Sequence, residues 1–234
     1  MDQLAVILPA AGSGSRLGSA VPKPFIEIEG DPILSHTLMS FLGVKRLRQI
    51  IIAVSSDQVA HTEQLLNNVS ARRSDVMFDI VEGGAERQYS IHNALRSVHN
   101  TVELVAVHDA VRPFVHPDHI EACCRTALIH DGAVLGVPAK DTIKQIAPDR
   151  EIQVTPDRSL LWQAQTPQVF RKSMLIRAYE SAIAEGFVGT DDSSLVERIG
   201  GKVKMVKGGR ENLKITYPID LEIAKLIIKS KNVP

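Results

Sequence analysis

The sequence predicts an α/β protein in which helices cover both faces of a mostly parallel sheet, a three-layer, Rossmann-like architecture. Short runs rich in β-branched residues alternate along the chain with longer runs whose apolar residues recur at helical spacing. The β-rich runs are apolar at nearly every position, which is typical of strands that are buried on both faces. With 234 residues, of which 44% are apolar, the chain can bury one sizeable core, so we expect a single domain over residues 1–234.

The strands and helices are expected in alternation. The predicted strands are Leu4–Leu8, Gln49–Val54, Met77–Val81, Glu103–Val107, Ala133–Val137 and Val203–Val206. The predicted helices are Pro32–Leu42, Gln58–Val69, Glu86–Val98 and Pro117–His130. Ligands of such sheets bind at the carboxyl ends of the strands, so the segments that follow the strands are where a site is expected.

One segment, Pro138–Leu160, breaks this alternation. It contains two short alternating runs, DTIKQIA and EIQVT, on either side of Pro148–Arg150. This pattern predicts a β-hairpin that protrudes as an arm. Because a lone hairpin is only marginally stable in water, we expect it to pack against another surface.

Composition excludes several classes of protein. Lysine plus arginine equals aspartate plus glutamate at 27 each, whereas a protein that binds nucleic acid or a membrane surface has a basic excess. No run approaches the roughly 18 apolar residues of a membrane helix, and we expect no signal peptide. Cys123 and Cys124 are adjacent and form no C-x-x-C motif, which fits a reducing cytoplasm.

The segment Leu8–Pro24, LPAAGSGSRLGSAVPKP, has the composition of a loop that binds polyphosphate. Gly12 and Gly14 let the backbone approach a ligand closely, so that its N–H groups can donate to phosphate oxygens. Arg16 and Lys23 add positive charge to the same loop. An ordinary solvated loop is the alternative, but solvated loops rarely combine a buried strand with paired cations.

Two familiar phosphate loops fit this segment less well. A Walker loop requires Gly-Lys followed by Ser or Thr, which the segment lacks. The dinucleotide fingerprint requires G-x-G-x-x-G and an acid about 20 residues further on. Here the third glycine, Gly18, comes one residue late, and Asp57 after the next strand is too far along. A dinucleotide-dependent oxidoreductase is therefore a less favoured interpretation, and failure of the protein to bind NAD would exclude it.

Two later segments also follow predicted strands and can face the same crevice. In GGAERQYS, Gly83 and Gly84 let backbone groups approach a flat base edge, although an ordinary helix start is the alternative. In VHDAVRP, Asp109 is suited to Mg²⁺ or to a ribose hydroxyl, unless it is simply a turn acid. Arg112 reaches a phosphate or pairs with a nearby acid.

The histidine-rich stretch beside the last predicted helix does not predict a metal site. Pro117 and Asp118 suit the first turn of that helix, where proline loses no hydrogen bond and an acid favours the helix dipole. His116 and His119 then flank the helix start, so we expect them to be structural or solvated.

Taken in order, the segments resemble a known family. LPAAGSGSRLGSAVPKP is similar to the signature loop of the sugar-phosphate nucleotidyltransferases. With the later segments GGAERQYS, VHDAVRP, DTIK, QTPQ, TDD and NLKIT, nearly the whole chain resembles the 2-C-methyl-D-erythritol 4-phosphate cytidylyltransferases. The resemblance implies transfer of CMP from CTP to 2-C-methyl-D-erythritol 4-phosphate, with release of pyrophosphate and with Mg²⁺ or another divalent cation as the cofactor.

The resemblance also assigns roles to residues of this chain. It implies catalytic residues at Arg16, Lys23 and Lys214. It implies nucleotide-binding residues at Ala10, Ala11, Gly12, Gly14, Gly83, Gly84, Ser90, Asp109 and Ala110, with Asp109 also the candidate metal ligand. It implies substrate-binding residues at Arg112, Thr142, Arg158, Thr166, Thr190 and Asp192. Ala85 stands where several family members carry an acid, so a side-chain contact to the base is lost there.

The same resemblance implies that the arm crosses to a second subunit. Thr142 and Arg158 would then serve the partner's site, and the protein would be a homodimer. The acceptor is a phosphate monoester, whose second pKa of about 6 leaves it largely dianionic at neutral pH. No general base is therefore needed, and we expect direct transfer while cations screen the triphosphate.

Two further interpretations stay open. The first is a cytidylyltransferase for another polyol phosphate, such as ribitol 5-phosphate, although Arg158 and the segment TDDSSLVE favour methylerythritol phosphate. The second is a nucleotide-binding protein without catalysis. The retained set of Arg16, Lys23, Asp109 and Lys214 argues against the second.

Overall fold

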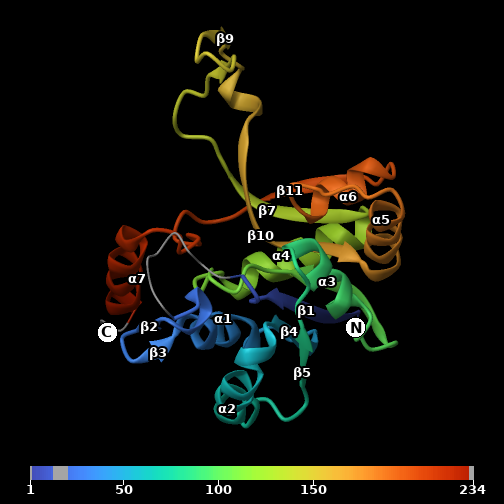
Figure 1. Cartoon of the computed structure of the whole chain (residues 1–234), viewed down its shortest axis with the longest axis vertical. Coiled ribbons are helices and arrows are strands. Elements are labelled where there is room, and N and C mark those ends of the chain that lie inside the picture. The colour runs from blue at the N-terminus through green and yellow to red at the C-terminus, as the bar shows by residue number, and fades with distance from the viewer. Residues whose placement is uncertain (1, 13–20, 232–234) are drawn as a thin grey trace.

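The structure is a computed structural model that describes residues 2–12 and 21–231. It contains a seven-stranded sheet with the order β11-β7-β10-β6-β1-β4-β5 (Figure 1). Its strands are β1 (Gln3–Pro9), β4 (Leu47–Val54), β5 (Met77–Glu82), β6 (Val102–Val107), β7 (Gly132–Pro138), β10 (Trp162–Arg171) and β11 (Val203–Lys207). Every predicted strand lies within one of these, which confirms the mostly parallel α/β sheet.

Helices flank the sheet on both sides. They are α1 (Ile33–Leu42), α2 (Val59–Ser70), α3 (Arg87–Leu95), α4 (Pro117–Ile129), α5 (Lys172–Ala184), α6 (Asp192–Arg198) and α7 (Pro218–Lys231). The first four confirm the predicted helices to within a few residues, whereas α5, α6, α7 and strand β10 are not among the predicted elements. Among the described residues, no helix combines the length and the apolar character needed to cross a membrane.

Strand β1 shows why the continuous apolar runs require helices on both faces. Its side chains alternate between the faces, as in any strand. Leu4, Val6 and Leu8 pack in one core with residues of α1, α2 and α4. Ala5 and Ile7 pack in a second core with residues of α3, α5 and α6. Each large aliphatic side chain buried in this way contributes about 1.5–3 kcal/mol, so neither face can be left to water.

Strand β10 makes the sheet mixed. It pairs antiparallel with both β6 and β7. Gln168 of β10 lies opposite Val107, the last residue of β6, so the first half of β10 continues beyond the carboxyl end of β6. Its register with β7 shifts between Ala164 and Gln168. The residues at this irregularity therefore lie beside the loop that follows β6.

The predicted arm is present and projects away from the body of the molecule (Figure 1). Its strands are β8 (Gln145–Ile146) and β9 (Ile152–Val154), which pair antiparallel. Ile146 is 51% exposed and Ile152 is 57% exposed, so the expected packing of the hairpin is not found within the described chain.

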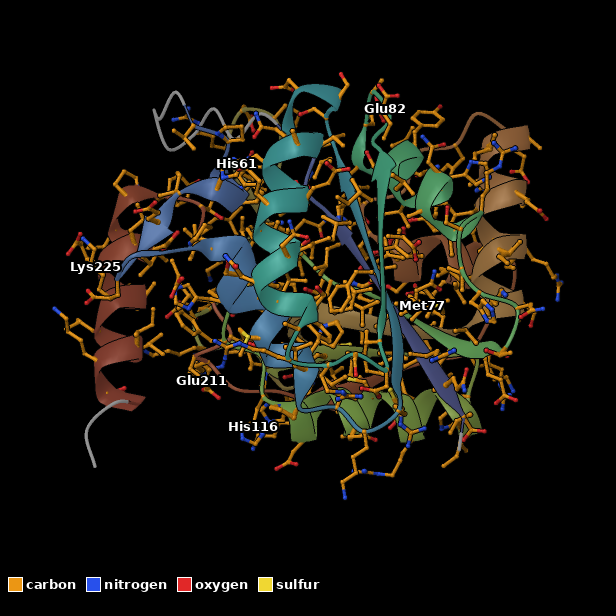
Figure 2. The ribbon with its side chains drawn as sticks, turned by 90° about the horizontal axis from the view of Figure 1, so that it is seen from below. His61, Met77, Glu82, His116, Glu211 and Lys225 are labelled. Atoms are coloured by element: carbon orange, nitrogen blue, oxygen red, sulfur yellow. The ribbon has the colours of Figure 1, made fainter. Side chains whose placement is uncertain are left out.

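Helix α7 stands to one side of the sheet. It packs on a short hairpin, β2 (Glu27–Ile28) with β3 (Asp31–Pro32), through a small core that includes Ile28, Ile215 and Ala224. Figure 2 shows Lys225 of α7 far from edge strand β5, whose two ends are marked by Met77 and Glu82. The segment that links β11 to α7 leaves the sheet where the parallel strands end, and α7 lies on that side (Figure 1).

Candidate active site

Three loops and one lysine meet in a crevice at the carboxyl edge of the sheet. The loops follow β1, β5 and β6, and strand order brings these three ends near one another. The crevice is lined by Pro9, Ala11, Gly12, Gly84, Ala85, Glu86, Arg87, Ser90, Asp109, Ala110, Val111 and Lys214. A larger hollow of about 610 Å³ lies between α3 and α5, but it is lined by none of the predicted site residues.

The two glycines after β5 permit close contacts that a side chain would block. A Cβ atom at Gly83 would lie 2.4 Å from the Cβ of Ala11, in the loop after β1. A Cβ atom at Gly84 would lie 2.4 Å from the Cβ of Tyr89. The Ser90 hydroxyl accepts from the Gly84 N–H at 3.0 Å and lies 3.1 Å from the Glu86 carbonyl oxygen. Ser90 thus holds the glycine segment against the start of α3.

Asp109 lies at the centre of the charged part of the crevice. Its Oδ2 is 3.1 Å from Lys214 Nζ and 3.2 Å from Arg112 Nε, and its Oδ1 is 3.8 Å from Arg87 Nε. Burial by itself raises the pKa of the Asp109 carboxyl, but these three cations outweigh it and hold the pKa well below its usual value. The carboxylate is therefore ionised at neutral pH and is surrounded by three cationic side chains.

The site includes one cation that the sequence interpretation missed. Arg87 donates to Asp192 Oδ1 at 3.2 Å and to Oδ2 at 2.8 Å, and the Tyr179 hydroxyl also donates to this carboxylate. Burial raises the pKa of Tyr179 well above its usual value, so its hydroxyl stays a donor. One signal was available, because Arg87 is the first residue of α3. A cation is unfavourable at a helix N-terminus unless an acid compensates it.

Two residues expected at the acceptor are placed differently by the structure. Asp192 has no exposed surface, and its carboxylate is occupied by Arg87 and Tyr179. Asp192 is the first residue of α6, directly after the N-cap Asp191, where an acid also interacts favourably with the helix dipole. Thr166 is only 5% exposed, and its hydroxyl contacts the backbone nitrogen of Asp109. Thr190, by contrast, is exposed in the loop before α6.

Lys23 brings the N-terminal loop to the C-terminal segment. It begins the short 3-10 helix Lys23–Phe25 and is 8% exposed. Its Nζ donates to the carbonyl oxygen of Thr216 at 3.5 Å, two residues beyond Lys214. The other cation expected in this loop, Arg16, lies outside the described residues, as does Gly14.

The arm residues lie apart from this crevice. Thr142 and Arg158 are both exposed, and neither lines the crevice formed by the described residues of their own chain. Arg158 belongs to the 3-10 helix Arg158–Leu160 and donates to the carbonyl oxygen of Lys140 at 2.8 Å.

The expected histidine arrangement is found at α4, where His116 is the N-cap and accepts from the Asp118 N–H.

A sheet edge that gathers glycine loops, a buried carboxylate and several cations is typical of a nucleotide-binding α/β enzyme. More narrowly, the chain belongs to the 2-C-methyl-D-erythritol 4-phosphate cytidylyltransferase family, whose model matches residues 4–230. It is therefore a cytidylyltransferase of the methylerythritol phosphate pathway.

Relatives with this name cover nearly the whole chain. One from Symbiobacterium thermophilum is 43% identical over 228 residues, which are 97% of this chain and 94% of the relative. One from Caldanaerobacter subterraneus is 39% identical over 226 residues, which are 97% of this chain and 99% of the relative. The crystal structure of 4-diphosphocytidyl-2C-methyl-D-erythritol synthase from Anaerococcus prevotii matches with a TM-score of 0.86 and 31% identity, covering 97% of this chain and 96% of that one.

Proposed function

We propose that the crevice holds CTP with Mg²⁺ and that the arm of a second subunit places the acceptor, 2-C-methyl-D-erythritol 4-phosphate. In the reaction, the acceptor phosphate attacks the α-phosphorus of CTP, CMP is transferred and pyrophosphate leaves. The observation that carries this proposal is the meeting of the loops after β1, β5 and β6 with Lys214 around one carboxylate, Asp109.

The lining of the crevice suggests how CTP lies in it. On the β1 side, Ala11 and Gly12 present backbone N–H groups to the triphosphate, with Ala10 behind them. On the β5 side, the Gly84 segment presents backbone to the cytosine ring, while the Ser90 hydroxyl holds that segment in place. Because position 85 is alanine, recognition of the base depends on backbone groups there.

The donor set fits a magnesium ion that arrives with the nucleotide. Asp109 supplies one carboxylate at the crevice, and no group of three His, Cys, Asp or Glu side chains gathers among the described residues. Mg²⁺ in such sites is commonly held by one or two carboxylates plus the substrate's phosphates. When bound, the ion would neutralise charge that develops on the phosphates.

The remaining chemistry is done by cations of the chain. We assign Lys214, Lys23 and Arg16 the role of neutralising the triphosphate and the departing pyrophosphate; Lys214 lines the crevice, and Lys23 contacts the backbone of Thr216, two residues beyond it. Interactions of this kind act on charge that develops in the transition state, which is where electrostatic stabilisation is most effective. Arg112 holds Asp109 and so keeps the carboxylate in place.

The arm supports a homodimer with composite sites. Ile146, Ile152 and Leu160 are 51%, 57% and 79% exposed, an apolar surface on an element that is too small to be stable alone. A second copy that covers this surface would bring Thr142 and Arg158 to the neighbouring crevice. Because the buried thiols of Cys123 and Cys124 are free, we also place the protein in a reducing compartment, the cytoplasm.

One assay tests the substrates. Pyrophosphate release is measured with CTP, UTP, ATP and GTP against a panel of polyol phosphates that includes ribitol 5-phosphate. We expect CTP with methylerythritol phosphate to be strongly preferred, with UTP the best of the wrong nucleotides, and activity to be lost when Mg²⁺ is chelated. Equal use of ATP would show that the Gly84 segment does not recognise cytosine. Preference for ribitol 5-phosphate would show that this compound, and not methylerythritol phosphate, is the acceptor.

A further inference from the structure

Thr166 lies beneath the crevice rather than in it. It belongs to β10, it is 5% exposed, and it is absent from the crevice lining formed by the described part of the chain. Its hydroxyl oxygen is 3.0 Å from the backbone nitrogen of Asp109 and 3.1 Å from Nδ1 of His108. Both atoms belong to the loop that positions the central carboxylate.

The direction of each hydrogen bond follows from its partners. Nε2 of His108 lies 3.0 Å from the carbonyl oxygen of Arg112, and because a carbonyl can only accept, Nε2 carries the proton. With the proton on Nε2, Nδ1 is the ring's acceptor, so the Thr166 hydroxyl donates to it. The hydroxyl has a single proton, so towards Asp109 its oxygen acts as the acceptor of the N–H.

The backbone of Thr166 reaches a second segment of the site. Its carbonyl oxygen accepts from Asn212 Nδ2 at 2.9 Å, and Asn212 is completely buried. The Asn212 carbonyl oxygen in turn accepts from Arg112 Nη1 at 2.8 Å. Since Asn212 stands two residues before Lys214, Thr166 connects β10 to the segment of Asp109 and also to that of Lys214.

We propose that Thr166 is a positioning residue for the nucleotide half of the site, because its hydroxyl fixes the backbone at Asp109 and with it the carboxylate that Lys214 contacts. The proposal replaces the expected acceptor contact of Thr166. It rests on the proposed placement of CTP around Asp109. Loss of the hydroxyl would leave the buried N–H of Asp109 and Nδ1 of His108 without partners, a state that folded proteins avoid.

The test separates the two substrates. In Thr166→Val the side chain keeps its shape and loses only the hydroxyl's hydrogen bonds. Calorimetric titration with CTP and Mg²⁺, without acceptor, should show at least tenfold weaker binding, and kcat should fall, while the KM for methylerythritol phosphate stays within about twofold. Thr166→Ser keeps the hydroxyl and should recover CTP affinity to within about threefold of the parent protein.

Thr62→Val is the matched control. Thr62 is buried like Thr166, and its hydroxyl donates to the Gln58 carbonyl oxygen at 2.8 Å, on α2 and outside the crevice. The same chemical change there should alter neither CTP affinity nor the acceptor KM. A loss of CTP affinity in this control as large as in Thr166→Val would overturn the proposal, because it would make the effect a general one of buried hydroxyls.

Other outcomes decide the rest. A raised acceptor KM with unchanged CTP affinity in Thr166→Val overturns the proposal in favour of an acceptor contact. If Thr166→Val does not fold, His108→Gln carries the test, since its amide keeps a donor for the Arg112 carbonyl and removes the ring acceptor of Thr166. We expect weaker CTP binding and an unchanged acceptor KM, and unchanged CTP affinity would overturn the proposal.

Lys214→Met, titrated in parallel, distinguishes failure of this inference from failure of the proposed function. If Lys214→Met binds CTP as tightly as the parent protein, CTP is not held at Asp109, and the placement of the nucleotide fails together with the inference that rests on it. If Lys214→Met weakens CTP binding and Thr166→Val does not, the placement stands and the inference about Thr166 alone is wrong.

Discussion

Arg87 makes a two-point hydrogen-bonded ion pair with Asp192, a carboxylate without exposed surface, and the two residues come from helices more than 100 positions apart in the chain. The pair joins the start of α3 to the start of α6, and Arg87 itself lines the crevice. Arg87 also lies 3.8 Å from Asp109, so one guanidinium links a structural carboxylate to the one at the centre of the site.

This pair predicts a large loss of stability in Arg87→Met. Removing one partner of a buried ion pair typically costs about 3–5 kcal/mol, because the other charge stays buried without compensation. The Arg87 side chain is 37% exposed, so we expect the lower end, about 3 kcal/mol, measured by urea denaturation. Arg198→Met is the control, since its pair with Glu185 is exposed and should contribute less than about 1 kcal/mol. Equal effects of the two variants would contradict the structural role of Arg87.

Lys214→Met should abolish most turnover in a folded protein. The variant keeps the aliphatic stem and removes the ammonium that lies 3.1 Å from Asp109. Loss of one preorganised electrostatic contact typically lowers kcat by about 10²–10³. Lys225→Met on α7 is the control, because its side chain is similarly exposed and its ion pair with Glu222 lies outside the crevice. Turnover of Lys214→Met within about threefold of the parent protein would remove this lysine from the mechanism.

Gly83→Ala should weaken CTP binding through the backbone. The new methyl group would lie 2.4 Å from Ala11 Cβ, so the loop after β1 must move away from the segment after β5. We expect the KM for CTP to rise at least tenfold, with the circular dichroism spectrum unchanged. In the control Gly43→Ala, the new Cβ lies 3.4 Å from Pro117 Cγ, an ordinary contact outside the crevice, and kinetics should not change. An unchanged KM in Gly83→Ala would mean that the two loops need not touch.

His108 predicts a dependence of stability on pH. Burial lowers its pKa from 6.5 to about 4 in the folded protein, so between these values the unfolded chain binds a proton that the folded protein does not. The free energy of unfolding should therefore rise with pH across this window, and acidification to pH 4 should cost about 3 kcal/mol from this group. Urea denaturation from pH 4 to 7 should show a shallower slope in His108→Gln. Parallel slopes for the two proteins would be evidence against a neutral, buried His108.

Mixed dimers test the arm. Arg158→Ala and Lys23→Met chains should each be nearly inactive alone, because each damages every site of its own homodimer. If Arg158 serves the neighbouring crevice, a hybrid contains one doubly damaged site and one intact site. Random exchange makes half of the dimers hybrids, so about a quarter of all sites should regain activity. Native mass spectrometry must first show that hybrids form, and verified hybrids without activity would place Arg158 in its own subunit or outside the mechanism.

The α/β class, the mostly parallel strands and the loops that follow them could be predicted from the sequence. Six strands and four helices were predictable because their apolar spacing is local, and a strand buried on both faces has to be apolar throughout. Gly84, Asp109 and Lys214 line the crevice. Gly84 and Asp109 were expected there because their motifs follow strands, and Lys214 was expected there from the family resemblance. The arm was predictable because Pro138–Leu160 interrupts the alternation of strands and helices.

Features that depend on partners distant in the chain could be seen only in the folded structure. Strand β10 was hard to predict from its own residues, because the first three are exposed and the strand is not apolar throughout. Its antiparallel direction is defined by its pairing with β6 and β7. Thr166 looked like one more polar residue near the acceptor until the fold placed its hydroxyl against Asp109. Asp192 likewise gained its role from Arg87, 105 positions earlier. A hydrogen bond between distant segments leaves no periodic pattern in a sequence, because the distance that defines it exists only after the chain has folded.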